Sequence, residues 1–308
     1  MNLADSDLAN WMQKLPDELS LAKIALPGTH NSAACYLTLP SVQCQGSSIS
    51  DQLLHGVRFL DIRVAAPFFT GCGAAFGSGP DDLQVIHGNF PVKLPFPAKL
   101  QDTLVDVYSF LQEHPSETVF VSIKAEGPFG FDKDDFANII WERYINPSHS
   151  RWFLSDQIPK AGDVRGKAVL FRRFGVPDDN RKGQFGIEAA WWKYNTTEDN
   201  QGDLAVQDWC EVMAPEDIAK KRDYISQHLN RAKDYNSTDT SEPKLFLNYC
   251  SGSNFWNPQC WPQRVSTAIS TSDFHNDLGA GCGIVIIDYA ESNDWATVRK
   301  LVESNIRT

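Results

Sequence analysis

The predicted fold rests on the stretch Leu26-Pro27-Gly28-Thr29-His30-Asn31-Ser32. An apolar run over residues 21–26 leads directly into a glycine-containing turn and an ionisable imidazole, which is typical of a buried strand that ends in a functional loop. Parallel α/β proteins keep their chemistry at the carboxyl ends of their strands. We therefore expect His30 at the functional edge of a parallel sheet.

Short apolar runs rich in β-branched residues alternate with helical patterns along the chain. The eight strand candidates are residues 21–26, 57–63, 83–87, 118–124, 167–172, 204–208, 244–249 and 283–288. Residues 100–114 carry apolar side chains at near-helical spacing and stop before Pro115, which predicts a crossover helix. Eight parallel strands in 308 residues predict one α/β domain, a TIM-type (β/α)8 barrel spanning residues 1–308.

Two segments interrupt this alternation. Residues 64–82 contain two glycine clusters, which predicts an irregular loop directly after Arg63. Residues 175–203 are polar, rich in Gly and Asn and contain Trp191-Trp192, so they form either a long loop or a broken helix. On a barrel, both segments would overhang the active-site face.

The composition excludes several classes of protein. A formal net charge of −11 with no Lys/Arg-rich block argues against nucleic acid as a partner and against strong electrostatic binding to anionic lipid. No stretch approaches the roughly 18 uninterrupted apolar residues of a membrane-spanning helix, and the first twenty residues lack a signal-peptide pattern. We expect a soluble enzyme, secreted or peripheral to a membrane, with a cytoplasmic location left open.

The seven cysteines include no CxxC pair, which argues against a zinc site and leaves the disulfide state open. Two glycosylation sequons begin at Asn195 and Asn236. About two sequons are expected by chance in a chain with this much Asn, Ser and Thr, so they do not indicate a location.

Ionisable side chains gather at the ends of the first three strand candidates. Asp61 and Arg63 lie on the same face of their strand because side chains alternate, and His87 ends the next candidate. Two histidines can serve as general base and general acid near neutral pH, and a guanidinium offers a bidentate fork to a phosphate. The set of His30, His87, Asp61 and Arg63 therefore indicates phosphoryl transfer.

Further charged residues end later strands. Lys124, Arg172 and Arg173 do so, although exposed strand ends often carry charge for structural reasons alone. Asp288 ends the last strand, which closes a barrel next to the first. We expect its carboxylate to hold the second nitrogen of His30, as in a catalytic triad.

Four stretches carry a family resemblance: residues 10–16, 24–30, 56–63 and 166–173. They resemble the bacterial-type phosphatidylinositol-specific phospholipase C family. The similarity continues through Val206-Gln207-Asp208 to Ile287-Asp288-Tyr289, so it covers nearly the whole chain. The fold of that family, a distorted and incompletely closed TIM barrel, agrees with the strand count.

The resemblance assigns roles to the first group of residues. His30 would be the general base that activates the inositol 2-hydroxyl, and His87 the general acid that protonates the diacylglycerol oxygen. Arg63 would neutralise the phosphate, Asp288 would orient His30, and Asp61 would support Arg63. The implied reaction releases diacylglycerol and inositol 1,2-cyclic phosphate.

The resemblance also implies a substrate-binding group. Lys124, Arg173 and Asp208 match positions that hydrogen-bond the inositol hydroxyls, and Asn31 is assigned to this group although the bacterial enzymes have Asp there. Cys210 stands where the family has a Tyr that stacks on the inositol ring. That aromatic platform is either lost or supplied by the Trp191-Trp192 pair.

A metal ion is not expected. Calcium-using relatives carry an acidic residue at the position of Arg63, and a fixed guanidinium would repel Ca²⁺ from the same space. We therefore predict an enzyme without metal or other cofactor. Asn31 resembles a calcium ligand of those relatives, which keeps the alternative open.

Exposed aromatic residues suggest a transient contact with a membrane. Phe68-Phe69, Phe255-Trp256 and Trp261 occur in loop-like contexts, where they either meet the lipid headgroups or cover the end of the barrel. The predicted protein is a monomer that acts on phosphatidylinositol, with glycosyl-phosphatidylinositol anchors as a further candidate. The alternatives are a metal-dependent glycerophosphodiester or sphingomyelin-type phosphodiesterase and an inactive inositol-lipid binding module.

Overall fold

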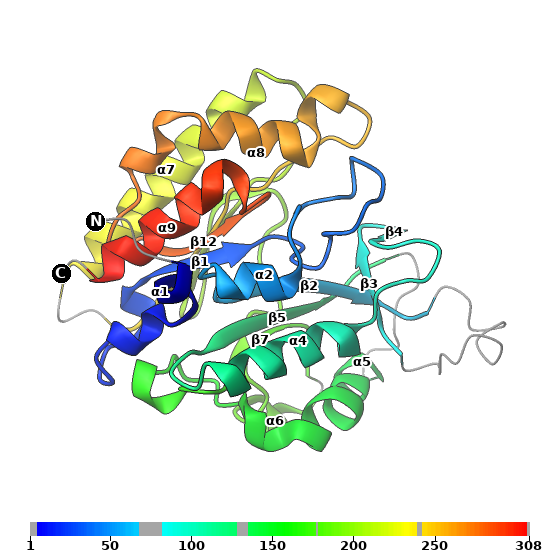
Figure 1. Cartoon of the computed structure of the whole chain (residues 1–308), viewed down its shortest axis with the longest axis vertical. Coiled ribbons are helices and arrows are strands. Elements are labelled where there is room, and N and C mark those ends of the chain that lie inside the picture. Colours follow the sequence, from blue (N-terminus) through cyan, green and yellow to red (C-terminus); the bar gives the residue numbers. More distant parts are fainter. Residues whose placement is uncertain (1–4, 68–81, 128–134, 177, 239–241, 307–308) are drawn as a thin grey trace.

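A curved parallel sheet forms the centre of the molecule. The structure, a computed structural model, describes residues 5–67, 82–127, 135–176, 178–238 and 242–306. Within these ranges seven parallel strands lie in the spatial order β7-β5-β2-β1-β12-β11-β10 (Figure 1). They are β1 (Ala25–Thr29), β2 (Phe59–Ala65), β5 (Val119–Ala125), β7 (Ala168–Arg173), β10 (Leu204–Asp208), β11 (Leu245–Tyr249) and β12 (Gly283–Ile287).

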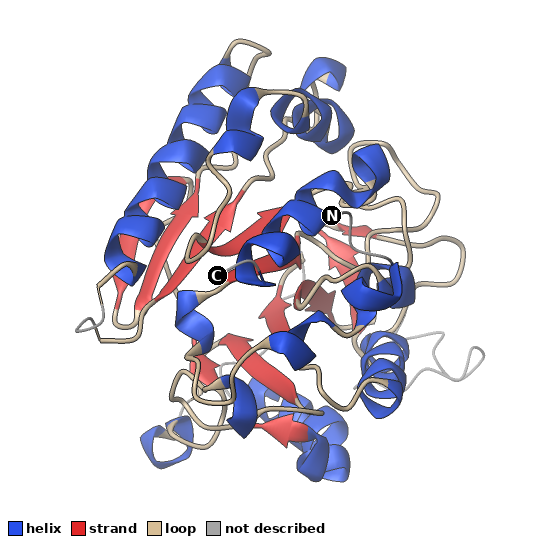
Figure 2. Ribbon diagram, turned by 60° about the vertical axis from the view of Figure 1, so that its left-hand side comes forward, coloured by secondary structure: helices blue, strands red, loops and turns tan. Residues whose placement is uncertain are grey.

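Helices surround these strands (Figure 2). The α-helices are α1 (Asp5–Ala9), α2 (Ile49–Leu54), α4 (Leu100–Glu113), α5 (Asp135–Ile139), α6 (Asp179–Lys182), α7 (Asp217–Asn236), α8 (Pro262–Ser270) and α9 (Ser292–Ile306). Single 3-10 or π turns occupy Trp11–Lys14, Leu21–Lys23, Ile140–Ile145, Asn146–Arg151, Ala161–Asp163, Pro258–Cys260 and Asp273–Asn276. Helices α7, α8 and α9 group on one side of the strands, and α4, α5 and α6 on the other (Figure 1). The predicted crossover helix is confirmed as α4.

The sheet curls like a barrel but its two edges do not meet. The outer edge of β7 pairs only with the two-residue strands β6 (Trp152–Phe153) and β8 (Ile187–Glu188), and β10 ends the other side with the antiparallel strand β9 (Thr196–Gln201). Within the described ranges no strand pairing joins β8 to β9. The fold is a distorted, incompletely closed TIM-type barrel, as predicted.

The first strand begins later than predicted. Residues 21–23 form a 3-10 turn, whose first N–H groups are satisfied by the Ser20 hydroxyl and by a neighbouring carbonyl, and β1 occupies residues 25–29. Within β1, a Cβ at Gly28 would lie 3.0 Å from the Cβ of Phe59 in β2. Glycine at this position therefore allows β1 to pack closely against its neighbour.

The third predicted strand does not belong to the barrel. Strand β3 (Gln84–His87) pairs antiparallel with the end of β2 and forms a hairpin with β4 (Phe90–Pro91). The two connecting residues include Gly88 at φ 60°, a left-handed conformation that suits a tight hairpin. The prediction of eight parallel barrel strands was therefore wrong for this strand, because β3 is antiparallel. His87 nevertheless lies at the end of its strand, as predicted.

The two interrupting segments differ from their predictions. Of the loop predicted over 64–82, residues 68–81, which include Phe68-Phe69, lie outside the described part of the chain, and β2 continues to residue 65. Residues 175–203 form neither a long loop nor a broken helix. They contain α6, β8 and β9, because the open edges of β7 and β10 leave backbone groups that short strands can pair with.

Three general features bear on the environment of the protein. No helix in the described ranges has both the length and the apolar character needed to cross a bilayer. All six cysteines in those ranges are free thiols. The side-chain amides of both sequon asparagines form hydrogen bonds with the backbone. Asn195 Oδ1 accepts from Cys210 N, and Asn236 Nδ2 donates to the Gly281 carbonyl.

Candidate active site

A cavity of about 360 Å³ opens at the carboxyl ends of the parallel strands. Seven of the nine predicted site residues line it: His30, Arg63, His87, Lys124, Arg173, Asp208 and Asp288. Asp61 and Asn31 are buried and lie outside this lining. Residues far apart in the sequence therefore meet in one place, as strand-end placement predicts.

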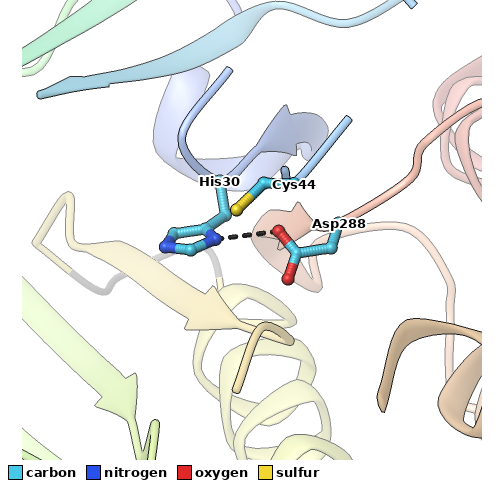
Figure 3. Close-up of side chains that lie close together, drawn as sticks. All are labelled: His30, Cys44 and Asp288. Atoms are coloured by element: carbon cyan, nitrogen blue, oxygen red, sulfur yellow. Dashed lines mark hydrogen bonds and ion pairs between the residues drawn. The ribbon is translucent and has the colours of Figure 1, made fainter. Parts of the chain in front are cut away.

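His30 and Asp288 form a hydrogen-bonded pair. His30 follows β1 and Asp288 follows β12, and these strands are neighbours with Thr29 opposite Ile287. His30 Nδ1 lies 2.8 Å from Asp288 Oδ1, and Figure 3 shows the carboxylate pointing at the ring. A carboxylate only accepts, so Nδ1 carries the proton and Nε2 keeps its lone pair. This arrangement suits a general base.

Buried amides hold the His30 segment in place. Gln45 Nε2 donates to the carbonyls of both His30 and Ile287, which ties the ends of β1 and β12 together. Asn31 adopts φ 41°, and its side-chain nitrogen lies 3.3 Å from His30 Nε2. The structure thus places Asn31 against the base. An incoming hydroxyl would compete with this amide for the Nε2 lone pair.

Arg63 bridges two carboxylates. Its guanidinium lies 3.0 Å from Asp61 Oδ2 and 3.3 Å from Glu126 Oε1. Lys124 also approaches Glu126 Oε1, at 3.3 Å. The Arg63 guanidinium is thereby held between the carboxylates of Asp61 and Glu126, and Arg63 lines the cavity.

These charges shift the protonation of the carboxyl groups. Burial alone would raise the pKa of Asp61, but the guanidinium groups of Arg63 and Arg173 lower that pKa well below its usual range. For Glu126, Arg63 and Lys124 outweigh burial and lower the pKa to about 2. Both carboxylates are therefore ionised at neutral pH, and they raise the pKa of Arg63 despite its burial.

His87 faces His30 from the β3–β4 hairpin. The two ring centroids are 5.7 Å apart and the ring planes are nearly perpendicular, at 88°. His87 Nδ1 donates to the Val42 carbonyl over 2.8 Å, which leaves Nε2 for proton exchange with a ligand. Burial, with the nearby His30 and Arg63, lowers the pKa of His87 to about 4. A bound anion would raise this pKa again.

Another part of the cavity wall combines Arg173 with aromatic rings. The Arg173 guanidinium stacks 3.8 Å above the Trp192 ring and donates to the Tyr249 hydroxyl over 3.2 Å. Trp192 Nε1 in turn donates to Asp208 Oδ2 over 3.0 Å. The network fixes the polar heads of Arg173 and Asp208 at the cavity, where they can meet hydroxyl groups.

Exposed aromatic side chains line the part of the cavity where stacking on an inositol ring was expected. Cys210, Trp191 and Tyr194 all line the cavity, with Trp191 66% and Tyr194 71% exposed. Trp192 is buried and one face of its ring already carries Arg173. Trp209, which directly follows β10, packs on Tyr224 of α7 and does not line the cavity. Of Trp191 and Trp192, Trp191 is therefore the one with an exposed ring that can stack on a ligand.

Some functional contacts were missed from the sequence, and one candidate falls outside the site. Arg172 points away from the cavity and binds the carbonyls of Phe185 and Phe174. Glu126 was missed although it lies two residues beyond Lys124, directly after β5. Tyr249 was missed although it ends β11. Cys44, beside His30 and Asp288 in Figure 3, carries no sequence signal because it lies in a loop.

Comparison with known proteins points to one enzyme class. Residues 26–174 match the family model described as phosphatidylinositol-specific phospholipase C, X domain. A 1-phosphatidylinositol phosphodiesterase of Staphylococcus aureus (strain Newman) is 28% identical, with 96% of this chain and 94% of that enzyme aligned. A second, from Listeria monocytogenes, is 25% identical, with 96% of this chain and 84% of that enzyme aligned.

A solved structure gives the same picture for the fold. The crystal structure of a pentafluoro-Phe-containing phosphatidylinositol-specific phospholipase C from Staphylococcus aureus superposes with a TM-score of 0.79 at 24% identity, covering 99% of both chains. This chain and the Staphylococcus aureus enzyme therefore share the same fold over nearly the whole length of both chains. The family model ends at residue 174, so a single catalytic domain spanning 1–308 stays a prediction.

Proposed function

We propose that this chain, which is similar to bacterial 1-phosphatidylinositol phosphodiesterases over 96% of its length, cleaves phosphatidylinositol into diacylglycerol and inositol 1,2-cyclic phosphate. The observation that carries this proposal is the facing pair of imidazoles, 5.7 Å apart, in one cavity with Arg63. Two proton-transfer groups beside a phosphate-binding cation are what an intramolecular phosphodiester displacement requires.

The proposed reaction uses the two histidines in opposite roles. His30 Nε2 takes the proton of the inositol 2-hydroxyl, and Asp288 stabilises the imidazolium that forms. The 2-oxygen attacks phosphorus while the bond to the diacylglycerol oxygen breaks. His87, protonated once the phosphate anion is bound beside it, gives its proton to that leaving oxygen. Arg63 balances the charge on the phosphate oxygens.

The remaining cavity residues are proposed to recognise the headgroup. Lys124, Arg173 and Asp208 offer charged donors and acceptors to the ring hydroxyls, and Trp191 offers an exposed aromatic face. Asn31 would act next to the base, since its amide contacts His30. Glycosyl-phosphatidylinositol anchors contain the same phosphodiester and are the second proposed substrate.

The proposed chemistry needs no metal ion. Ca²⁺ binds clusters of oxygen ligands, and the carboxylates of Asp61 and Glu126 are already neutralised by the Arg63 guanidinium between them. The residues present therefore do not fit a calcium site at this wall of the cavity. Arg63 supplies the positive charge that a cation would otherwise bring.

A membrane-facing surface is proposed beside the cavity mouth. Phe90 on the β3–β4 hairpin stacks on Phe255, with ring centroids 5.3 Å apart, and Trp256 follows at 87% exposure. Trp261 Nε1 donates to the Phe255 carbonyl and braces this loop. Phe90 lies three residues from His87, so the surface adjoins the proposed acid. We propose a monomer that binds the bilayer peripherally and transiently.

The reaction is tested with two lipids and a chelator. Phosphatidylinositol and phosphatidylcholine vesicles are incubated separately with the protein, each with and without EDTA. We expect diacylglycerol from phosphatidylinositol alone, at the same rate in both conditions. Loss of activity in EDTA would favour the metal-dependent phosphodiesterase, and no cleavage of either lipid would favour a binding module.

The membrane surface is tested with a matched pair of variants. Trp256→Ala should lower turnover of phosphatidylinositol in vesicles but leave turnover of a water-soluble inositol phosphodiester unchanged. Leu54→Ala removes an exposed apolar side chain at the carboxyl end of α2, outside the cavity lining, and should affect neither assay. Equal loss in both assays for Trp256→Ala would contradict an interfacial role.

A further inference from the structure

Three potential metal ligands, one of them the proposed base His30, lie close together in the interior. A nitrogen of His30, the thiol of Cys44 and a carboxylate oxygen of Asp288 all lie within 4.8 Å of one another, and all three residues are buried (Figure 3). They come from three segments: the residue after β1, the loop between β1 and α2, and the residue after β12. Of the described residues, these are the ones that gather as such a cluster.

The backbone holds the three ligands in place. Tyr289 N donates to the Cys44 carbonyl over 2.8 Å, which ties the thiol segment to the residue after Asp288. Cys44 N donates to the Ala34 carbonyl over 3.0 Å. With the adjacent Gln45 amide bound to the His30 and Ile287 carbonyls, all three ligands sit on one hydrogen-bonded frame. A preorganised donor set of this kind reduces the cost of binding an ion.

The donor types select a class of cation. One sulfur, one imidazole nitrogen and one carboxylate oxygen suit Zn²⁺ or Cd²⁺, whereas Ca²⁺ and Mg²⁺ require oxygen ligands. Ligand atoms around tetrahedral zinc lie roughly 3.5 Å apart at ordinary bond lengths. The 2.8 Å contact between His30 and Asp288 would therefore open by roughly 0.7 Å. Water would complete the fourth position.

We propose that His30, Cys44 and Asp288 form an inhibitory binding site for a thiophilic divalent cation such as Zn²⁺ or Cd²⁺. Two of the ligands, His30 and Asp288, line the cavity, which gives the ion a path from solvent. The ion then binds His30 at Nδ1, on the side of the ring that faces Asp288. The inhibition rests on the proposed function, whereas the binding does not.

Binding at Nδ1 removes the base. The Sγ–H bond of Cys44 breaks as the sulfur–metal bond forms, and that proton leaves to solvent. The His30 ring proton moves from Nδ1 to Nε2, because the metal now occupies the Nδ1 lone pair. Nε2 then has no lone pair to accept a proton from substrate, and Asp288 no longer stabilises an imidazolium. The ion lies behind the catalytic nitrogen, so it should lower kcat more than it changes KM.

Binding is tested directly with Cd²⁺. A thiolate-to-cadmium charge-transfer absorption should rise to a plateau at one equivalent in the wild-type protein. Cys44→Ser should lose this absorption and weaken cadmium binding at least about tenfold. Two other free thiols provide matched controls: Cys282→Ser changes a buried one and Cys210→Ser one that lines the cavity, and both should keep the absorption. Absorption that persists in Cys44→Ser, or disappears in Cys210→Ser, would overturn the site.

A measurement on the wild-type protein covers the case in which Cys44→Ser fails to fold. X-ray absorption with one equivalent of Zn²⁺ should show a single sulfur at roughly 2.3 Å together with nitrogen and oxygen ligands. A zinc environment without sulfur would contradict the proposal.

The inhibitory consequence is tested separately. Micromolar Zn²⁺ should lower kcat on phosphatidylinositol in the wild type and in Cys282→Ser, and the inhibition constant should rise at least about tenfold in Cys44→Ser. Millimolar Ca²⁺ should not inhibit. Equal inhibition in the wild type and Cys44→Ser would overturn the inhibitory role even if cadmium binds. An enzyme inactive in every arm would count against the proposed function and leave the binding result standing.

Discussion

The two walls of the cavity are built differently. On one wall, His30, Asp288 and Arg63 lie in or directly after strands of the parallel sheet, and each side chain is fixed by a buried partner. On the other wall, Trp191 and Tyr194 come from the segment between β8 and β9 and are largely exposed. The difference suggests that the chemistry depends on the sheet, and that aromatic stacking on the headgroup depends on the segment at its open edge. Substitutions on the first wall should lower turnover, and those on the second should weaken substrate binding.

The largest effect is expected at the two histidines. His30→Ala and His87→Ala should each reduce kcat by roughly 10²–10⁴-fold, because each removes a proton-transfer group. Both variants should still unfold cooperatively, since neither side chain is part of the apolar core. Initial-rate assays on phosphatidylinositol, with thermal melts as the control, decide the outcome. Activity close to that of the wild type in either variant would remove that residue from the acid–base pair.

The next largest effect is expected at Arg63. Arg63→Lys should lose roughly 10²-fold or more in kcat, because an ammonium cannot reproduce a bidentate fork on phosphate while also holding two carboxylates. Arg63→Asp should be inactive alone and gain some activity when Ca²⁺ is added, because it supplies a third carboxylate. Normal turnover by Arg63→Lys would reassign the residue to a structural ion pair with Asp61.

The same division explains what could be predicted from sequence. His30, Arg63 and Asp288 were found because apolar runs mark strands, and strands of a parallel sheet end at one edge. The hairpin position of β3 was missed since periodicity gives a strand but not its direction. Cys44 was missed because no periodic pattern connects a loop residue to its neighbours in space.

A smaller effect is expected on the aromatic wall. Trp191→Ala should raise KM roughly tenfold with little change in kcat, as expected for the loss of one stacking face on the headgroup. Trp209→Phe, directly after β10 and outside the cavity lining, is the matched control and should leave both constants unchanged. A fall in kcat as large as that of the histidine variants would mean that the two walls do not act separately.

The smallest effect concerns pH. The pKa of His87 is about 4 in the folded protein, below the ordinary value near 6.5, so the unfolded chain takes up a proton first as the pH falls. This residue should therefore lower the free energy of unfolding between about pH 6.5 and 4, with no effect above that range. NMR titration of the His87 ring should give the low pKa, and His30→Asn should raise it, because the neighbouring His30 is one of the groups that lower it. A His87 that titrates near pH 6.5 would contradict the buried, neutral ring.

The central claim is that His30 deprotonates the substrate's own hydroxyl and not a water molecule. Phosphorus NMR during the first turnovers tests this most directly, because attack by the adjacent 2-hydroxyl is intramolecular and must give a cyclic phosphate. We predict that inositol 1,2-cyclic phosphate appears first, that inositol 1-phosphate follows slowly, and that a lipid methylated at the 2-hydroxyl is inert. Direct formation of inositol 1-phosphate without the cyclic species, or cleavage of the methylated lipid, would contradict the account.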